Sequence, residues 1–134
     1  METSVLTVKT GSSASVVDLT PDVADFVRGK GDGLVNVFVP HATAGVAIIE
    51  IGAGSDRDLL MSLDNLLPKD NRWTHEHGSP GHGRDHVMPA FVAPSISIPV
   101  EADMMKLGTW QSIVLVDLNI DNPERRVRMS FLTG

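Results

Sequence analysis

The stretch Trp110-Gln-Ser-Ile-Val-Leu-Val-Asp-Leu-Asn119 decides the fold class, because a long run of β-branched and aliphatic residues is typical of a strand. A second run, Arg126–Leu132, predicts another long strand. The two runs are joined by Asp121-Asn-Pro123, whose residue types favour a tight turn. We therefore expect the chain to end in two strands joined by a hairpin turn.

Upstream of this pair, the sequence predicts two helices and more strands. Thr20 is the expected N-cap of the first helix, with Pro21 at its first position and Gly29 at its end. The second helix is predicted at Ser55–Leu67, where five leucines form the buried face and Pro68 stops the helix. The remaining expected elements are strands at Ser4–Lys9 and Ser13–Leu19, paired as a hairpin, strands at Gly33–Val39, Gly45–Ile51 and Ser95–Val100, and a helical turn near Val87–Phe91.

This order of elements predicts an α+β fold in one domain that spans residues 1–134. About eight strands and two or three helices without strict alternation are typical of a mostly antiparallel β-sheet or sandwich. A chain of this length buries roughly two-thirds of its surface on folding, which is enough for a real core.

The composition argues against several classes of function. No apolar run approaches the roughly 20 residues that cross a bilayer, so no membrane segment is expected. The N-terminus lacks a basic segment followed by an apolar one, and there is no cysteine, so we expect a cytoplasmic protein. The net charge of −6 argues against nucleic-acid binding, which depends on Lys and Arg. In the last strand Arg126 and Arg128 share one face and Arg125 lies on the other.

Histidine is concentrated in one place. Four of the five histidines fall within twelve positions, in Trp73-Thr-His75-Glu-His77-Gly-Ser-Pro-Gly-His82-Gly-Arg-Asp85-His86. This segment belongs to the longest irregular stretch, residues 68–86, and loops of that length are usually functional or disordered. The fifth histidine, His41, follows a predicted strand. Histidine can hold a metal or move a proton near neutral pH, so we expect a His-rich site.

Two kinds of chemistry fit these residues. His41, His75 and His86 are the expected ligands of a divalent metal, with Glu50 or Asp85 as fourth ligand or orienting group. His75 and His77, two positions apart, could also chelate together. Without a metal, the histidines would act as general acids and bases, or only form hydrogen bonds in a polar pocket, with His77 and His82 exposed.

Four motifs carry a resemblance to a known family. They are His41-Ala-Thr43-Ala, the Gly-rich segment that ends at His86, Leu107-Gly108-Thr109-Trp110-Gln111 and Asp121-Asn-Pro-Glu-Arg125-Arg126. In this order they resemble the YjbQ-like family, which is also named for a secondary thiamine-phosphate synthase activity. The family-matched polar residues are His41, Thr43, Glu50, His75 and His86. The chain departs from the family pattern at Ala42, Trp73, His82 and Asp85, and His77 is an extra histidine.

The resemblance implies a YjbQ-like fold in a homotrimer, with the histidines near the subunit interface. It also implies a weak transfer activity that joins a hydroxymethylpyrimidine pyrophosphate to a thiazole phosphate and releases pyrophosphate. His41, Glu50, His75 and His86 are then the candidate catalytic residues, and zinc or magnesium is the candidate cofactor. The candidate substrate-binding residues are Thr43, Arg84, Thr109, Gln111 and Arg125, and Trp110 is expected in the core or an interface rather than stacked on a base.

Two other functions remain open from the sequence. The chain could be a trimeric module that binds a metal or a phosphorylated metabolite without significant catalysis. It could also be a structural trimer in which a metal bridges the subunits.

Overall fold

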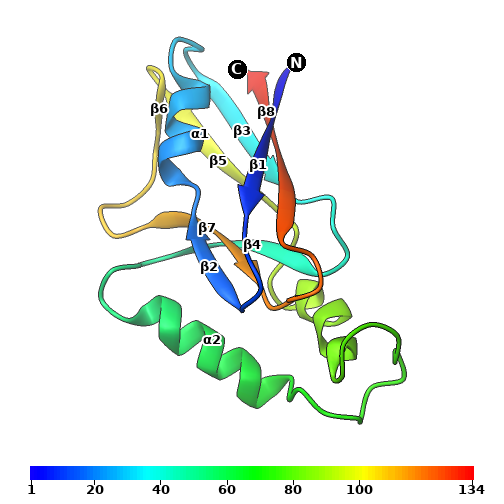
Figure 1. Cartoon of the computed structure of the whole chain (residues 1–134). Helices are drawn as coiled ribbons and strands as arrows, with labels where there is room; N and C mark the ends of the chain where they lie inside the picture. Colours follow the sequence, from blue (N-terminus) through cyan, green and yellow to red (C-terminus); the bar gives the residue numbers. More distant parts are fainter.

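The computed structural model describes all 134 residues, and two antiparallel sheets form its frame (Figure 1). The large sheet has five strands in the order β1-β8-β3-β5-β6, and the small sheet has three in the order β2-β7-β4. The strands are β1 (Glu2–Lys9), β2 (Ser15–Asp18), β3 (Gly33–Phe38), β4 (Ala44–Ile49), β5 (Ser95–Glu101), β6 (Met104–Met105), β7 (Ser112–Asp117) and β8 (Glu124–Thr133). The helices are α1 (Thr20–Val27), α2 (Ser55–Leu66) and the short 3-10 helices η1 (His82–His86) and η2 (Met88–Ala90). The predicted α+β class is confirmed.

Neither predicted hairpin forms. β1 pairs with β8, with Val8 opposite Arg125, whereas β2 pairs with β7, with Val16 opposite Val116. The turn at Asp121–Pro123 likewise leads from β7 in the small sheet to β8 in the large one. Both turns are therefore corners between the sheets. Turn chemistry shows where the chain reverses, but the partner of each strand depends on distant residues.

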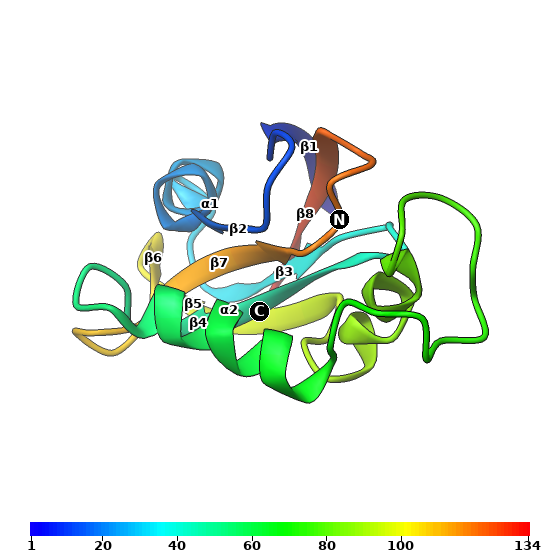
Figure 2. The same cartoon turned by 60° about the horizontal axis from the view of Figure 1, so that its bottom comes forward.

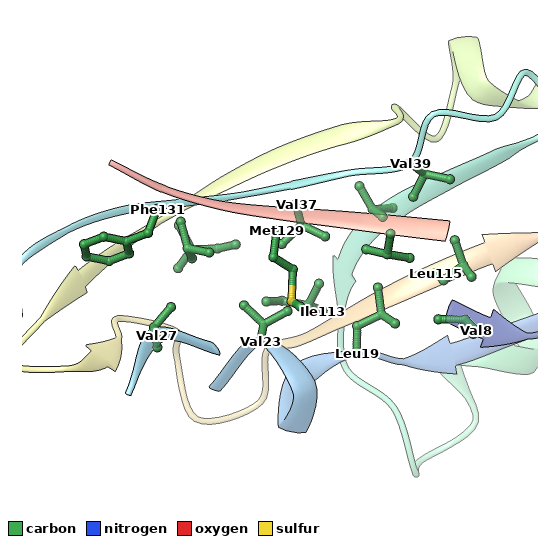
Figure 3. Close-up of a cluster of buried hydrophobic side chains, with 14 of the residues drawn as sticks. Val8, Leu19, Val23, Val27, Val37, Val39, Ile113, Leu115, Met129 and Phe131 are labelled. Carbon is green, nitrogen blue, oxygen red and sulfur yellow. The ribbon is translucent and has the colours of Figure 1, made fainter. Parts of the chain in front are cut away.

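Strand β7 lies between two apolar layers, which explains its unbroken apolar run. Ile113 and Leu115 face the main core, shared with the large sheet and α1 (Figure 3). Val114 and Val116 face the opposite way, toward a second core built on α2 and η2. Figure 2 shows α2 along the small sheet, with the His-bearing loop gathered at one end. Both faces of the strand are buried, so hydrophobicity does not alternate along it.

Both helices form at the predicted places, but some side chains differ from expectation. In α2 only Leu63 is fully buried, joined by Leu67 just beyond the helix, and Leu66 is 55% exposed. The first residue of α1 is Thr20 itself, and its Oγ1 accepts a hydrogen bond from the Ile113 N–H (2.9 Å) instead of capping the helix. The contact with β7 thus replaces the predicted cap. Neither helix is long and apolar enough to cross a membrane.

The N-terminal end of β7 differs from the prediction as well. The strand begins at Ser112, and the preceding residues form a turn in which Gln111 Oε1 accepts the Gly108 N–H (2.7 Å). Trp110 in this turn is 73% exposed, so its expected place in the core of this chain is wrong. In β8, by contrast, Arg126 and Arg128 share one face and Arg125 lies on the other, as predicted. The structure adds that Arg125 is buried and that Arg126 and Arg128 are exposed.

Candidate functional site

The His-bearing loop is held against η1 by close backbone packing. A Cβ on Gly83 would lie 2.4 Å from the His75 carbonyl oxygen and 2.4 Å from Trp73 Cβ, so only glycine fits there. Trp73 also donates its indole N–H to the Pro68 carbonyl (2.9 Å). These contacts place His75 directly against the first turn of η1, which carries His82 and His86 at its two ends.

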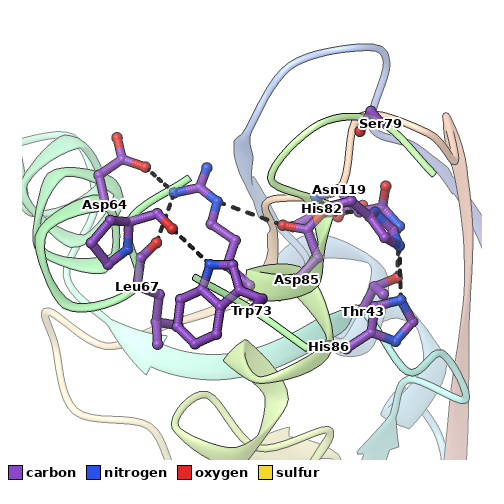
Figure 4. A network of polar contacts seen from close by, with 12 residues as sticks. Thr43, Asp64, Leu67, Trp73, Ser79, His82, Asp85, His86 and Asn119 are labelled. Atoms are coloured by element: carbon purple, nitrogen blue, oxygen red, sulfur yellow. Dashed lines mark hydrogen bonds and ion pairs between the residues drawn. The ribbon is translucent and has the colours of Figure 1, made fainter. Parts of the chain in front are cut away.

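Three histidines converge at this point. The nearest ring nitrogens of His75, His82 and His86 all lie within 4.8 Å of one another. His82 Nε2 and His86 Nε2 are 2.8 Å apart (Figure 4). His75 Nε2 is buried without a hydrogen-bond partner. The structure therefore groups His82, rather than His41, with His75 and His86. The alternative of an exposed His82 is wrong, because its residue is only 6% exposed.

Two carboxylates flank the far nitrogen of His82. Its Nδ1 lies 3.2 Å from Asp85 Oδ2 and 3.1 Å from Asp121 Oδ2. Asp121 is itself fixed by the backbone N–H (3.1 Å) and the hydroxyl (3.0 Å) of Ser79, and these bonds hold its pKa below the usual value. Burial raises the pKa of Asp85. These contacts lack hydrogen-bond geometry, and they act through charge: two carboxylates beside Nδ1 favour a proton on that nitrogen, which directs the Nε2 lone pair into the cluster.

Electrostatics keep the other two rings neutral. Burial, reinforced by the neighbouring imidazoles, lowers the pKa of His75 and of His86 below the ordinary value. Neutral imidazole is the form that ligates a metal. The cluster therefore favours binding of a cation over protonation of its own rings.

Arg84 does not face open solvent or a cavity. Its buried guanidinium contacts Asp64 on α2, donates to the Leu67 carbonyl (3.2 Å) and has its Nε 3.7 Å from Asp85 Oδ1 (Figure 4). It ties the end of α2 to η1, next to the carboxylate that orients His82. In this structure Arg84 is placed to position the site rather than to contact a phosphate.

A second polar network lies under the start of β4. Arg125 and Asp117, each 1% exposed, form a two-pronged ion pair with N–O distances of 2.6 and 2.9 Å. The same guanidinium donates to Thr43 Oγ1 (2.8 Å), and Asn119 Nδ2 donates to that oxygen as well (3.0 Å). Because both lone pairs of the Thr43 hydroxyl are used, its proton is left to donate to another group. Arg125, predicted to bind substrate, is buried and uses its Nε and one terminal nitrogen in bonds within the chain.

His41 lies beside this network and outside the cluster of three histidines. Its Nε2 accepts the backbone N–H of Arg126 (3.0 Å), so only Nδ1 remains to contact a ligand. Burial and the nearby Arg125 charge lower the pKa of His41, which favours the neutral ring with a proton on Nδ1. His41 is thus placed as a hydrogen-bond donor.

The remaining predicted site residues lie at the other end of the small sheet. Ala44 pairs with Asp117 at one end of the β4–β7 ladder, and Ile49 pairs with Ser112 at the other. Glu50 follows Ile49, and Thr109 and Gln111 precede Ser112, so all three are separated from Thr43 by the length of β4, roughly 17–20 Å. Figure 1 shows the two ends, with the His-bearing loop on the right.

A polar cavity of about 360 Å³ opens beside the histidines. Its walls carry two carboxylates and no lysine or arginine; the lining residues are Asp70, Asn71, Trp73, His75, Glu76, Pro80, Gly81 and His82. An anionic molecule in this cavity therefore needs a positive charge that the walls do not supply.

Comparison with known proteins places the chain in a family. The family model described as UPF0047 protein YjbQ-like matches residues 4–134. This chain belongs to that family. It is 62% identical to the UPF0047 protein Rv2556c of Mycobacterium tuberculosis, with all of both chains covered, and 32% identical to the UPF0047 protein YugU of Bacillus subtilis, covering 90% of this chain and 91% of that one.

Solved YjbQ-like structures share the fold. The hypothetical protein APE1520 from Aeropyrum pernix superposes with a TM-score of 0.89 at 33% identity, and both chains are fully covered. The protein SSO2532 from Sulfolobus solfataricus, described as YbjQ-like and of unknown function, superposes with a TM-score of 0.91 at 25% identity over 99% of this chain and 97% of that one. The family is one of unknown function, so the chemistry must be argued from the site.

The sequence alone did not identify several residues of the site. Among the family-matched histidines, His75 and His86 meet in the cluster, while His41 does not. From the sequence, His82 is one of the clustered histidines but is treated as a departure from the family pattern or as an exposed residue, although its position four residues before His86 is a usable signal. Asp117, Asn119 and Asp121 were taken for strand and turn residues, and their polar contacts are visible only in the fold.

Proposed function

We propose that this YjbQ-like protein is a small-molecule enzyme whose site holds a divalent metal on His75, His82 and His86. The observation that carries the proposal is the convergence of three imidazoles, with a buried, unpartnered His75 Nε2 and a His82 ring oriented by two carboxylates. Imidazole suits zinc and other transition metals, whereas magnesium prefers oxygen ligands. Of the two expected metals, the site favours zinc.

The surroundings fit a phosphorylated substrate only when a cation is present. A bound divalent ion would polarise a phosphate oxygen and balance the developing negative charge. In its absence Glu76 on the cavity wall repels an anion, whereas the charge of Asp70 is balanced by its ion pair with Arg72. Thr43 and His41 each have one proton to donate to an acceptor on the substrate, while Asp121 and Ser79 keep His82 in place.

Within this chemistry we propose the secondary thiamine-phosphate synthase reaction as one activity of the site. A hydroxymethylpyrimidine pyrophosphate and a thiazole phosphate are joined, and pyrophosphate leaves. Both substrates and the leaving group are anions, which agrees with the need for a cation beside an acidic cavity wall.

The test is turnover by the purified protein with and without zinc. Product formation should disappear after chelation, return when zinc is restored, and be absent in His82→Ala with zinc present. Turnover that survives chelation, or that His82→Ala retains, contradicts a metal-dependent enzyme.

A second candidate function is a module that binds a metal or phosphorylated metabolite without catalysis. The ion pairs of Arg84 with Asp64 and of Arg125 with Asp117 favour this alternative, because neither guanidinium is then free to stabilise a leaving group. Tight zinc binding without turnover at any substrate concentration would select this alternative.

We also propose the homotrimer, because it gives the separated residues a role. Glu50, Thr109 and Gln111 cannot reach the histidines of their own chain, but a second copy can bring its own set to them. The exposed Trp110 in the same turn supports a contact there. Light scattering should give the mass of three chains, and Trp110→Ala should reduce it. A monomer in solution contradicts this assembly.

A further inference from the structure

A fourth imidazole lies beside the three that form the proposed metal site. The ring of His77 is 3.9 Å from that of His75, and 6.0 Å from those of His82 and His86, measured between centroids. The six separations among the four rings all lie between 3.8 and 6.0 Å. His77 is therefore part of the same group of rings, although its residue is exposed.

These separations match what four ligands of one ion require. A zinc–nitrogen bond of about 2.0–2.1 Å places the ring centroid roughly 3 Å from the ion, and two rings of a tetrahedral site then lie roughly 5 Å apart. The observed distances fall on both sides of that value. Three of the rings offer nitrogens within 4.8 Å of one another, and the ring of His77 joins them by moving away from that of His75, which lies 3.9 Å from it.

The four rings differ in how firmly they are held. His82 and His86 lie on η1 and are joined by a hydrogen bond, and His82 also contacts two carboxylates. His77 lies in the irregular loop, two residues after His75, with Gly78 in the left-handed conformation (φ 90°) directly after it. An exposed ring beside a glycine can leave the group without disturbing the buried contacts.

We propose that His77 is an exchangeable fourth ligand of the metal, which closes the site when no substrate is present and is displaced when one binds. This inference rests on the proposed metal site. Sites with four protein ligands are typically structural, whereas catalytic sites keep one position open. When His77 is bound, the site is closed, so the metal is held more strongly and anions have restricted access to it. When His77 is displaced, one position on the metal is open.

Cobalt(II) is the probe, because its visible absorption and its shifted proton signals report the number of bound imidazoles. The protein is loaded with cobalt as wild type, as His77→Ala and as Thr74→Ala, which is a control at an exposed position of the same loop. Thermal unfolding of the metal-free proteins confirms that each variant is folded.

Wild type and Thr74→Ala should show four exchangeable imidazole N–H signals and the same absorption spectrum, and His77→Ala should show three signals and a changed spectrum. The cobalt dissociation constant of His77→Ala should rise at least about tenfold. Inorganic phosphate should change its spectrum at about tenfold lower concentration than in wild type, because no closed state competes.

Three signals in wild type, or identical spectra and affinities in all three proteins, overturns the role of His77 and leaves the three-histidine site intact. A wild-type protein that binds no cobalt overturns both proposals.

Discussion

The two ends of the β4–β7 ladder carry residues that the sequence assigned to one site, and they differ in almost every physical respect. At the Ala44 end, Arg125, Asp117 and Thr43 are buried and bonded to one another, and Asp121 links this end to His82. At the Ile49 end, Glu50, Thr109 and Gln111 are exposed in turns. The polar groups at the Ala44 end are already held in place before a ligand binds, as a catalytic site requires. The exposed side chains at the Ile49 end need a contact with another molecule to hold them in place.

Breaking the buried ion pair should have the largest effect on stability. Asp117→Ala leaves Arg125 charged, buried and unpaired, which is expected to reduce the free energy of unfolding by about 3–5 kcal/mol. Urea denaturation of the variant and of the wild type measures this loss of unfolding free energy. Glu50→Ala at the exposed end should change stability by less than about 0.5 kcal/mol. Similar losses in both variants contradict the contrast between the two ends.

Removing the carboxylate that orients His82 should weaken metal binding without unfolding the protein. Asp121→Asn removes the charge 3.1 Å from His82 Nδ1, and the zinc dissociation constant is expected to rise about 10–100-fold. Competition with a chelating dye measures this dissociation constant. The matched change at an exposed carboxylate on α1, Asp22→Asn, should leave the zinc affinity unchanged, and an equal loss there would contradict a specific role for the charge beside His82.

Glycines at the two ends offer a steric comparison. In Gly83→Ala the new Cβ meets the His75 carbonyl and Trp73 at 2.4 Å, so we expect a loss of about 1–3 kcal/mol and weaker zinc binding. In Gly108→Ala the nearest atom is Gln111 Oε1 at 3.2 Å, at the end of a flexible side chain, so little should change. Zinc binding of wild-type strength in Gly83→Ala would show that the close packing does not position His75.

The smallest expected effect is on the pH dependence of the metal-free protein. The pKa values of His41, His75 and His86 are lowered from 6.5 in the folded chain. Well above pH 6.5 these rings are neutral in both states. As the pH falls below 6.5 the unfolded chain takes up protons first, so the free energy of unfolding decreases.

Asp85, with its raised pKa, opposes this trend as it takes up a proton in the folded state, but the three histidines outnumber it. Urea denaturation across this pH range should give a slope that is reduced in a His75→Gln, His86→Gln double variant. An unchanged slope contradicts the assignment of the trend to these rings.

The sequence predicted the elements well and their partners poorly. Apolar runs located β7 and β8, but only the fold shows that β7 has two buried faces and that Asp121–Pro123 is a corner between sheets. Local spacing indicated a His-rich segment at residues 75–86, but the expected ligand set included His41 and left out His82. Local spacing could not place His41, because that position depends on the pairing of β8 with β3 and on the open N–H of Arg126.

The same dependence on distant residues explains why the sequence did not predict the buried network of Arg125, Asp117 and Thr43. Asp117 and Arg125 are eight residues apart in sequence. Asp117 stands between two apolar residues, and Arg125 is one of three arginines at the start of the last strand, so neither pattern indicates the other as its partner. Their pairing depends on two sheets meeting at one corner. Long-range contacts of this kind leave no local pattern to find.

The central claim is that His82, and not His41, completes the metal site. Elemental analysis of protein purified without a histidine tag tests it most directly, with wild type beside His82→Ala and His41→Ala. We predict about one zinc per chain in wild type and His41→Ala, and none in His82→Ala. Zinc that is retained in His82→Ala and lost in His41→Ala would contradict the account.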